Sequence, residues 1–223
     1  MIKINKKLLL TFSILLCSKV LMSMERKHSM HESLPGTRKR IKFSSLFGEK
    51  GIKNPAQQLN IACRLGDFEK VESLLLNYPD IDINNINTPL ITAISEGFTD
   101  IVELLLMQPR VDVNQVNRYG QTPLKAAVQK RFTDIIKLLS SHPNIDINKP
   151  NCVEETPLHF AVSIGNRDAA ELLLSHPDID INKLDRKGKT PLDIAFKNNN
   201  MIDLILTHKR QKKNSLISTE PKE

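Results

Sequence analysis

Apolar and polar positions between residues 54 and 206 recur every 34 residues. Each unit holds an apolar stretch after a Thr-Pro-Leu triplet, then a polar break, then a second stretch rich in Leu and Ile. In one such second stretch, Ile101, Leu104 and Leu105 lie at i, i+3 and i+4, which is the spacing of one helix face. The pattern therefore predicts two short helices in every unit.

The residues that bound these helices keep the same period. The Thr-Pro-Leu triplet occupies residues 88–90, 122–124, 156–158 and 190–192. Its Thr is suited to cap a helix N-terminus, and its Pro fits the first helical position. Pro109, Pro143 and Pro177 prevent the second helices from continuing. The β-branched segment 145–148 is expected to be extended. Because helix pairs this short cannot bury their apolar faces alone, the units are expected to stack.

These motifs resemble the ankyrin repeat, most fully in the six residues from Thr156 to Ala161, which read Thr-Pro-Leu-His-Phe-Ala. The resemblance implies an all-α solenoid of about five stacked helix-turn-helix repeats with β-hairpin fingers, covering residues 54–208. His159 is then a structural residue. The first repeat lacks the triplet and resembles an N-terminal cap, and the last, from Thr190 to about His208, serves as the C-terminal cap.

Departures from the pattern predict local differences. The connection between repeats one and two is four residues shorter than the others, which predicts a stunted finger. Glu154 stands where the other fingers have Gly120 and Gly188, so the second finger is expected to take a different shape. Leu138 lies in the predicted apolar stripe, and its replacement by Ala is expected to destabilise the stack by roughly 2–5 kcal/mol.

The formal charge of +7 is unevenly distributed. Residues 1–53 hold twelve Lys and Arg against three Asp and Glu, residues 54–206 hold fifteen against twenty, and residues 207–223 hold five against two. The repeat body is therefore acidic and would repel a phosphate backbone. With aromatic residues at 4%, a platform for stacking nucleic-acid bases is not expected.

The segments outside the repeats differ from them in composition. Residues 1–23 have a basic start and an apolar run, which is typical of a signal peptide and predicts export. An uncleaved leader acting as a membrane anchor is the alternative. We expect a disordered linker at 24–53, whose basic run 38–42 could instead be a nuclear-import or nucleic-acid segment. Residues 209–223 are predicted to be a disordered basic tail.

No motif for catalysis accompanies the repeats. The chain has no phosphate-binding glycine loop, no GxSxG and no HExxH. Cys63 and Cys152 form no close pair, and we interpret them as a buried thiol and a loop thiol. His142 and His176 are expected to end helices, where a partly charged imidazole suits the helix dipole. We therefore expect no enzyme activity, cofactor or metal.

The resemblance implies that a partner protein binds the finger tips and the concave face of the first helices. The finger positions are Arg118, Tyr119, Gln121, Cys152, Val153, Glu155, Arg186, Lys187 and Lys189. The helix positions are Ser95, Glu96, Gln129, Lys130, Ser163, Ile164, Lys197 and Asn198.

Arg118 and Tyr119 are the preferred anchors, because Arg and aromatic side chains dominate binding hot spots. The basic third finger could meet an acidic patch. The resulting hypothesis is a monomeric adaptor, scaffold or inhibitor that binds an unknown protein. Nucleic-acid association through the basic N-terminal segment and a membrane-tethered scaffold remain as alternatives.

Overall fold

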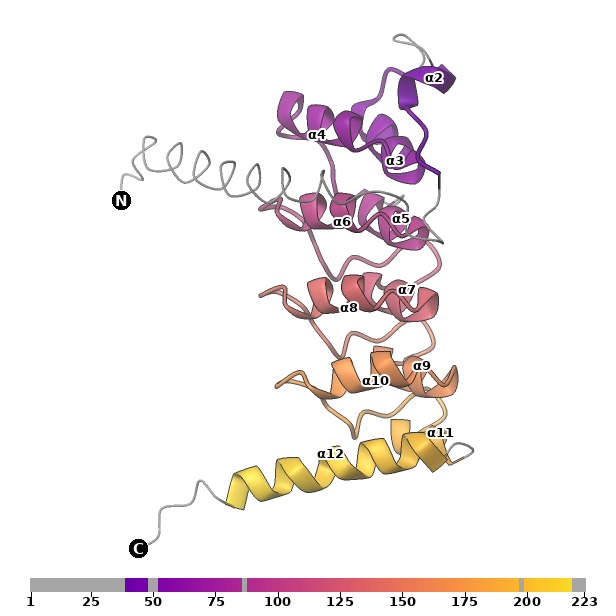
Figure 1. The fold of residues 1–223 in the computed structure, drawn as a ribbon, viewed down its shortest axis with the longest axis vertical. Coiled ribbons are helices and arrows are strands. Elements are labelled where there is room, and N and C mark those ends of the chain that lie inside the picture. The colour runs from indigo at the N-terminus through magenta and orange to yellow at the C-terminus, as the bar shows by residue number, and fades with distance from the viewer. Residues whose placement is uncertain (1–38, 48–51, 86–87, 197–198, 218–223) are drawn as a thin grey trace, which may run out of the picture. The chain divides into compact units, whose positions relative to one another are not determined.

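A computed structural model describes residues 39–47, 52–85, 88–196 and 199–217, which hold eleven helices and no strand (Figure 1). The helices are α2 (Phe43–Phe47), α3 (Pro55–Leu65), α4 (Phe68–Asn77), α5 (Pro89–Glu96), α6 (Thr99–Leu106), α7 (Pro123–Lys130), α8 (Thr133–Ser140), α9 (Pro157–Ser163), α10 (Arg167–Leu174), α11 (Pro191–Ala195) and α12 (Asn199–Ile217). From α3 onward they form five pairs, and each first helix packs on the first helix of the next pair. The predicted helical repeat stack is confirmed.

The predicted Thr caps are present at three of the four triplets. The hydroxyl oxygen of Thr122 accepts the N–H of Lys125 at 3.1 Å, and Thr156 and Thr190 cap their helices in the same way. Thr88 makes no such bond, because its backbone is left-handed with φ of 42°. It ends the short connection between repeats one and two. Residues 86 and 87 of that connection, on which the predicted stunted finger depends, lie outside the described residues.

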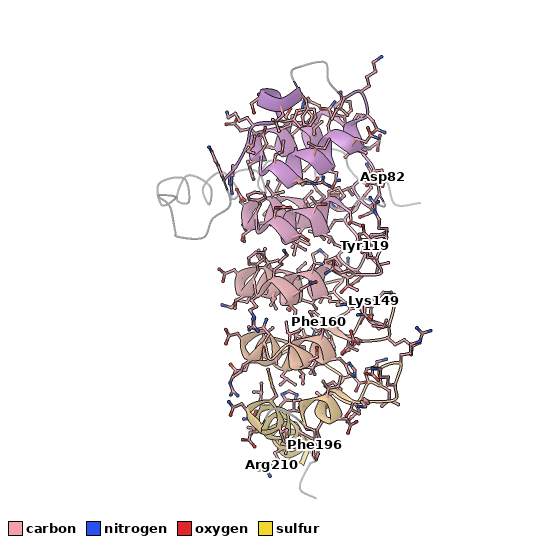
Figure 2. All side chains as sticks on the ribbon, turned by 90° about the vertical axis from the view of Figure 1, so that its right-hand side faces the viewer. Asp82, Tyr119, Lys149, Phe160, Phe196 and Arg210 are labelled. Carbon is pink, nitrogen blue, oxygen red and sulfur yellow. The ribbon has the colours of Figure 1, made fainter. Side chains whose placement is uncertain are left out.

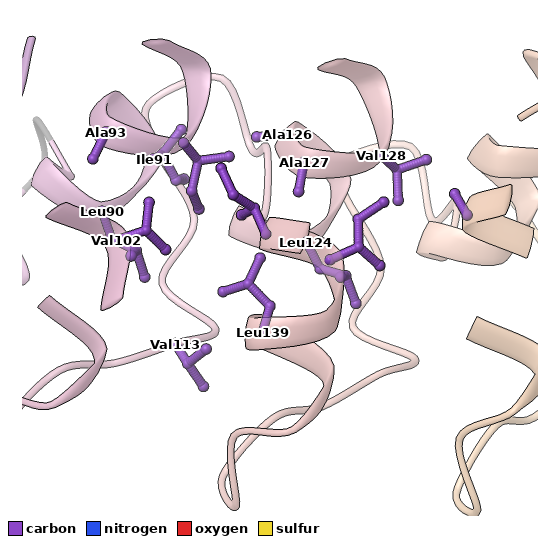
Figure 3. Close-up of a cluster of buried hydrophobic side chains, with 14 of the residues drawn as sticks. Leu90, Ile91, Ala93, Val102, Val113, Leu124, Ala126, Ala127, Val128 and Leu139 are labelled. Carbon is purple, nitrogen blue, oxygen red and sulfur yellow. The ribbon is translucent and has the colours of Figure 1, made fainter. Parts of the chain in front are cut away.

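The core lies between the two layers of helices. The residues of α8 that face it differ from the predicted apolar stripe. Ile135, Ile136 and Leu139 of α8 are at most 1% exposed, whereas Leu138 is only half-buried. Figure 3 shows Leu139 beside Leu124 of α7 within this cluster. Leu138 and Leu139 are adjacent apolar residues, and α7 packs on the side that Leu139 faces. The large destabilisation predicted for Leu138 therefore belongs to Leu139.

Asparagine side chains connect successive repeats. Asn114 donates from Nδ2 to the carbonyl oxygen of Asn144 at 2.7 Å and accepts the N–H of Asp146 at Oδ1 at 2.9 Å. Asn84 and Asn148 make the same two bonds to the following repeat. Each of these side chains thus satisfies main-chain groups of its neighbour, which fixes the register of the stack.

The aspartates of the same segments shape local turns. The carboxylate of Asp146 accepts the N–H of Asn148 at 3.0 Å, and Asp112 and Asp180 do the same two residues upstream of their own Asn. The N–H of Lys149 also donates to the Asp146 carbonyl at 3.0 Å, so residues 147 and 148 of the segment predicted to be extended form a turn. The described residues contain no strand, so the hairpin character of the fingers is not confirmed.

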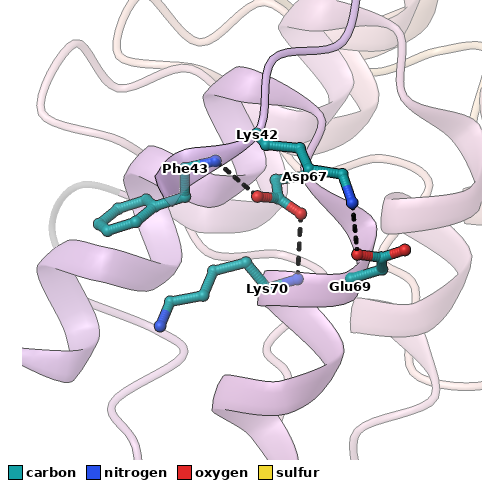
Figure 4. A network of polar contacts seen from close by, with 5 residues as sticks. All are labelled: Lys42, Phe43, Asp67, Glu69 and Lys70. Atoms are coloured by element: carbon teal, nitrogen blue, oxygen red, sulfur yellow. Dashed lines mark hydrogen bonds and ion pairs between the residues drawn. The ribbon is translucent and has the colours of Figure 1, made fainter. Parts of the chain in front are cut away.

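A segment that precedes the repeats docks on their first pair. Residues 39–47, within the range predicted to be a disordered linker, are ordered against α3 and α4. Phe43 is 4% exposed, and its N–H donates to the Asp67 carboxylate at 2.6 Å (Figure 4). Ile41 donates to the Leu65 carbonyl at 2.9 Å. One buried aromatic ring and two backbone bonds hold this segment, which we call the strap.

The basic residues of the strap contact acidic side chains of the second helices. Arg40 pairs with Asp100 at 2.8 Å, and Lys42 pairs with Glu69 at 3.0 Å. The Arg40 guanidinium also lies 5.5 Å from the centroid of the Phe98 ring. The positive charge of Arg40 and Lys42, within the basic run 38–42, is therefore partly neutralised by acidic side chains of the repeats.

The last repeat departs from the period. Its second helix, α12, begins at Asn199 and continues to Ile217, into the range predicted to be a disordered tail. Met201 and Ile205, four residues apart, face the core. Among the helices that the structure describes, none has the length and apolarity needed to cross a membrane.

Candidate protein-binding surface

Each of the three longer fingers, which follow repeats two, three and four, is held by one side chain at its base. The Oδ1 atom of Asn117 accepts the N–H groups of Tyr119 at 2.9 Å and of Gln121 at 3.0 Å. The N–H of Asn117 donates to the Gln121 carbonyl at 3.1 Å and closes the loop. A loop fixed by three bonds presents its tip in a defined position.

The same hydrogen-bonding arrangement occurs in the other two of these fingers, at Asn151 and Asp185. Asn151 accepts from Val153 and Glu155 at 3.0 Å each. Asp185 accepts from Lys187 at 2.8 Å and from Lys189 at 2.9 Å, and these bonds lower the pKa of its carboxyl group. The sequence interpretation overlooked these three residues, although their 34-residue spacing was visible.

The turn residue of each finger has a left-handed backbone. Gly120 and Gly188 have φ of 67° and 70°, and Glu154 has φ of 60°. The second finger keeps the Asn151 bonds and the N–H donation from Glu154 to the Asn151 carbonyl at 3.0 Å. The different shape predicted for this finger is therefore wrong. Glu154 adopts the glycine conformation, at a strain of roughly 1–2 kcal/mol for a residue with a Cβ.

The finger tips are exposed, as the sequence predicts. Tyr119 is 74% exposed, and the guanidinium of Arg118 lies 5.9 Å from its ring centroid. Val153 and Arg186 are also exposed. Cys152 is exposed, and its thiol donates to the Tyr119 carbonyl at 3.5 Å, which links the first two fingers.

The predicted residues at the finger bases mostly support the fingers. Gln121 is half-buried and donates from Nε2 to Oε1 of Gln129 on α7 at 2.7 Å. Glu155 is half-buried and accepts from Nδ2 of Asn151 at 3.1 Å. The side chain of Lys189 is exposed, and its carbonyl oxygen lies 3.0 Å from Nε2 of the buried His159. Within this group, only Lys189 offers an exposed side chain.

The predicted first-helix positions divide in a similar way. Lys130, Ser163 and Gln129 are exposed, whereas Ile164 is half-buried against the core. Ser95 and Glu96 are half-buried, and Lys197 and Asn198 lie outside the described residues.

Phe160 belongs to this face but was missed by the sequence interpretation. Figure 2 shows it on the face formed by the first helices, with Tyr119 and Lys149 along one edge. The ammonium group of Lys125 lies 4.7 Å from the centroid of the Phe160 ring. The sequence does contain a sign of this role, because Phe160 occupies the position that the small residue Ala126 has one repeat earlier.

The cysteine and histidine side chains described next have structural roles in the repeats. Burial raises the pKa of the Cys63 thiol, which keeps it protonated. His142 and His176 accept backbone N–H groups at Nδ1, at 3.2 Å each, from residues two positions later. Both rings therefore contact the turn that follows a second helix, which is consistent with their expected place at helix ends. Within the described residues, no cluster of His, Cys, Asp and Glu could hold a metal ion.

Comparison with known proteins agrees with the stacked arrangement. A family model described as ankyrin repeats, in three copies, matches residues 59–151 and 144–216. These matches cover more than half of the chain and include all three fingers. Comparison with curated protein sequences gives no match.

Proposed function

This chain belongs to the ankyrin repeat family, and from that premise we propose that it is a non-enzymatic module that binds a partner protein through its finger tips and first-helix face. Repeats of this family generally mediate protein–protein interactions. The partner is a protein whose surface meets several fingers at once, and the chain acts as an adaptor, scaffold or inhibitor in monomeric form.

One observation carries the proposal. All three fingers are closed by the same bonds from a base residue, and each presents exposed side chains at its tip. Ordered loops lose little conformational entropy on binding, so contacts at their tips contribute more fully to affinity. An exposed Tyr beside an Arg is the composition enriched at the centres of interfaces.

The nucleic-acid alternative has weaker support. Within the basic run, Arg40 and Lys42 form ion pairs with Asp100 and Glu69 of the repeats. Phosphate contacts would have to compete with these pairs, and the acidic repeat body would oppose the approach.

Export is the second part of the proposal. Residues 1–23, the predicted signal peptide, lie outside the described residues, and a cleaved leader would release the repeats into an extracytoplasmic compartment. The N-terminal mass of the mature protein, isolated from the cells that make it, tests this directly. A chain that retains Met1 and sediments with membranes would favour the tethered scaffold.

Site-specific crosslinking tests the binding surface. A photoreactive amino acid replaces Tyr119 in the full chain, and a matched variant carries it at Met107, which is also exposed but lies at the end of a second helix. We expect a protein adduct from position 119 and none from position 107. Adducts only from position 107, or equal labelling from both, would place the working surface elsewhere.

A further inference from the structure

Charge is segregated within the repeat body. We define the finger row as residues 115–121, 149–155 and 183–189, which are equivalent positions of three repeats. The row holds six Lys and Arg against three Asp and Glu, whereas the rest of residues 54–206 holds nine against seventeen. The finger row is thus positive on a body that is otherwise negative.

Two of the three acidic residues in the row face the protein itself. Asp185 accepts two backbone N–H groups, and Glu155 is half-buried and accepts from Asn151. Glu154 is the acidic residue that remains exposed toward solvent. In the part of the chain that the structure describes, no ion pair involves Arg186, Lys187, Lys189, Lys149 or Lys183. These cations are therefore available to a partner.

Apolar side chains lie between the cations. Of the eleven exposed large hydrophobic residues in the described ranges, four belong to the row: Val116, Tyr119, Val153 and Leu184. Val116 and Leu184 occupy equivalent positions, with the exposed Pro150 between them in sequence. An apolar series flanked by cations differs from a uniformly charged surface, because it can desolvate part of its partner.

We propose that the finger row binds an extended, acidic polypeptide segment that carries apolar side chains between its carboxylates. This inference rests on the proposed function and names the class of partner. Apolar side chains of the segment contact Tyr119 and Val153, and its carboxylates meet the third finger at Arg186 and Lys187. The negative charge of the remaining body steers such a segment onto the row and away from the second helices.

A polypeptide is favoured over nucleic acid as the source of the negative charge. Tyr119 is the aromatic residue in the row, so successive bases would find no series of rings on which to stack. The phosphate groups of a nucleic acid would make no favourable contacts with the apolar residues of the row. Acidic side chains interspersed with Leu or Tyr match both components of the surface.

The test measures binding of fluorescent peptides to the full chain. One peptide alternates Asp and Glu with Leu and Tyr, a second replaces the acids by Lys, and a third replaces them by Ser. A single-stranded oligonucleotide of equal charge is the fourth probe. We expect the acidic peptide alone to bind, with an affinity that falls as NaCl rises.

Charge reversal localises the effect. The double variant Arg186→Glu and Lys187→Glu should weaken binding of the acidic peptide by about tenfold or more. The matched double variant Lys137→Glu and Lys209→Glu changes exposed cations on α8 and α12 and should change affinity less than about twofold. Equal weakening by both variants, or equal binding of the Lys or Ser peptide, would overturn the inference. Tighter binding of the oligonucleotide would assign the row to nucleic acid.

Failure of this inference and failure of the proposed function give different results. If the position-119 crosslinker labels a partner whose capture survives reversal of Arg186 and Lys187, the finger surface stands and the acidic class is wrong. If position 119 labels no protein and the acidic peptide does not bind, both proposals fall.

Discussion

The two ends of the repeat stack are finished differently. At the N-terminal end, the strap covers the first helix pair and buries Phe43 to 4% exposure. At the C-terminal end, Phe196 is 82% exposed, although Ile94 and Val128 at the equivalent positions are fully buried. Ile94 and Val128 lie inside α5 and α7, whereas α11 ends at Ala195 and Phe196 is its C-cap residue.

The difference shows that a repeat unit does not determine how it is capped. A terminal repeat needs an outer face that water tolerates, and this chain meets that need by two means. At the N-terminal end, the strap, which precedes the repeats, covers the first helix pair. The other end extends its last helix and leaves one aromatic ring exposed.

Replacing a buried leucine in the middle of the stack gives the largest expected loss of stability, against which changes at the two ends can be compared. Leu139→Ala should lower the free energy of unfolding by about 2–5 kcal/mol, because Leu139 is fully buried between two layers. Leu138→Ala, one residue away and half-buried, should have a clearly smaller effect. Urea denaturation followed by circular dichroism measures both. A larger loss from the Leu138 variant would contradict the observed helix register.

The aromatic residues at the two ends should respond unequally to truncation. Phe43→Ala should cost about 3 kcal/mol, near the lower limit for buried aromatics, because the loss is confined to one terminal unit. Phe196→Ala should change stability by less than about 0.5 kcal/mol. The measurement is again urea denaturation, with proteolysis near residue 40 as a local probe of the strap. Equal effects at Phe43 and Phe196 would remove the distinction between the ends.

Two glycines with the same backbone conformation offer a finer comparison. Gly66 and Gly188 have φ of 72° and 70°, but a Cβ on Gly66 would lie 2.6 Å from the Phe98 ring, whereas a Cβ on Gly188 would meet nothing within 4 Å. Gly188→Ala should cost about 1 kcal/mol from the left-handed backbone alone. Gly66→Ala should cost roughly 2–3 kcal/mol because crowding adds to that strain. Thermal unfolding of the two variants decides whether the ring contributes.

The smallest expected effects are opposite responses to pH. At the C-terminal end, hydrogen bonds from backbone N–H groups lower the pKa of Asp185 below 3.8. Its stabilisation is complete above 3.8 and is lost as the pH falls through the lower folded value. At the N-terminal end, the hydrogen bond to Glu69 raises the pKa of Lys42 above 10.5, so its stabilisation is complete below 10.5 and is lost as the pH rises through the higher folded value.

The variants Asp185→Asn and Lys42→Gln measure these two contributions separately. The difference in Tm between Asp185→Asn and the unaltered chain should shrink in acid, and that for Lys42→Gln should shrink in alkali. Because Lys42 is exposed and Asp185 is only half-buried, each difference should be small and should decrease with salt. A Lys42→Gln difference that persists above the raised pKa would show that the ion pair is not its source.

The repeat itself could be predicted because its signals are local and recur. Thr122, Thr156 and Thr190 cap their helices through atoms three residues away, so the sequence pattern contains both partners. Exposure of Tyr119 and Val153 follows from their place in the fingers. Such features depend on spacing, which a single sequence displays.

The remaining features depend on contacts that spacing does not reveal. Phe43 is one aromatic residue in a polar segment, and its partner Asp67 lies 24 residues away. Leu138 and Leu139 are equally apolar, and only the packing of α7 distinguishes them. Asn117 and Asp185 look like ordinary loop residues until their bonds to the finger backbone are seen.

The asparagine bonds between repeats have a consequence for how such a chain can change over generations. The side chains of Asn84, Asn114 and Asn148 form their hydrogen bonds to the following unit with its main-chain atoms, so these bonds do not depend on which side chains that unit carries. A copied unit inserted after Asn114 would meet the same carbonyl and the same N–H. Duplication or loss of one whole unit would therefore change the number of fingers while leaving this set of hydrogen bonds intact.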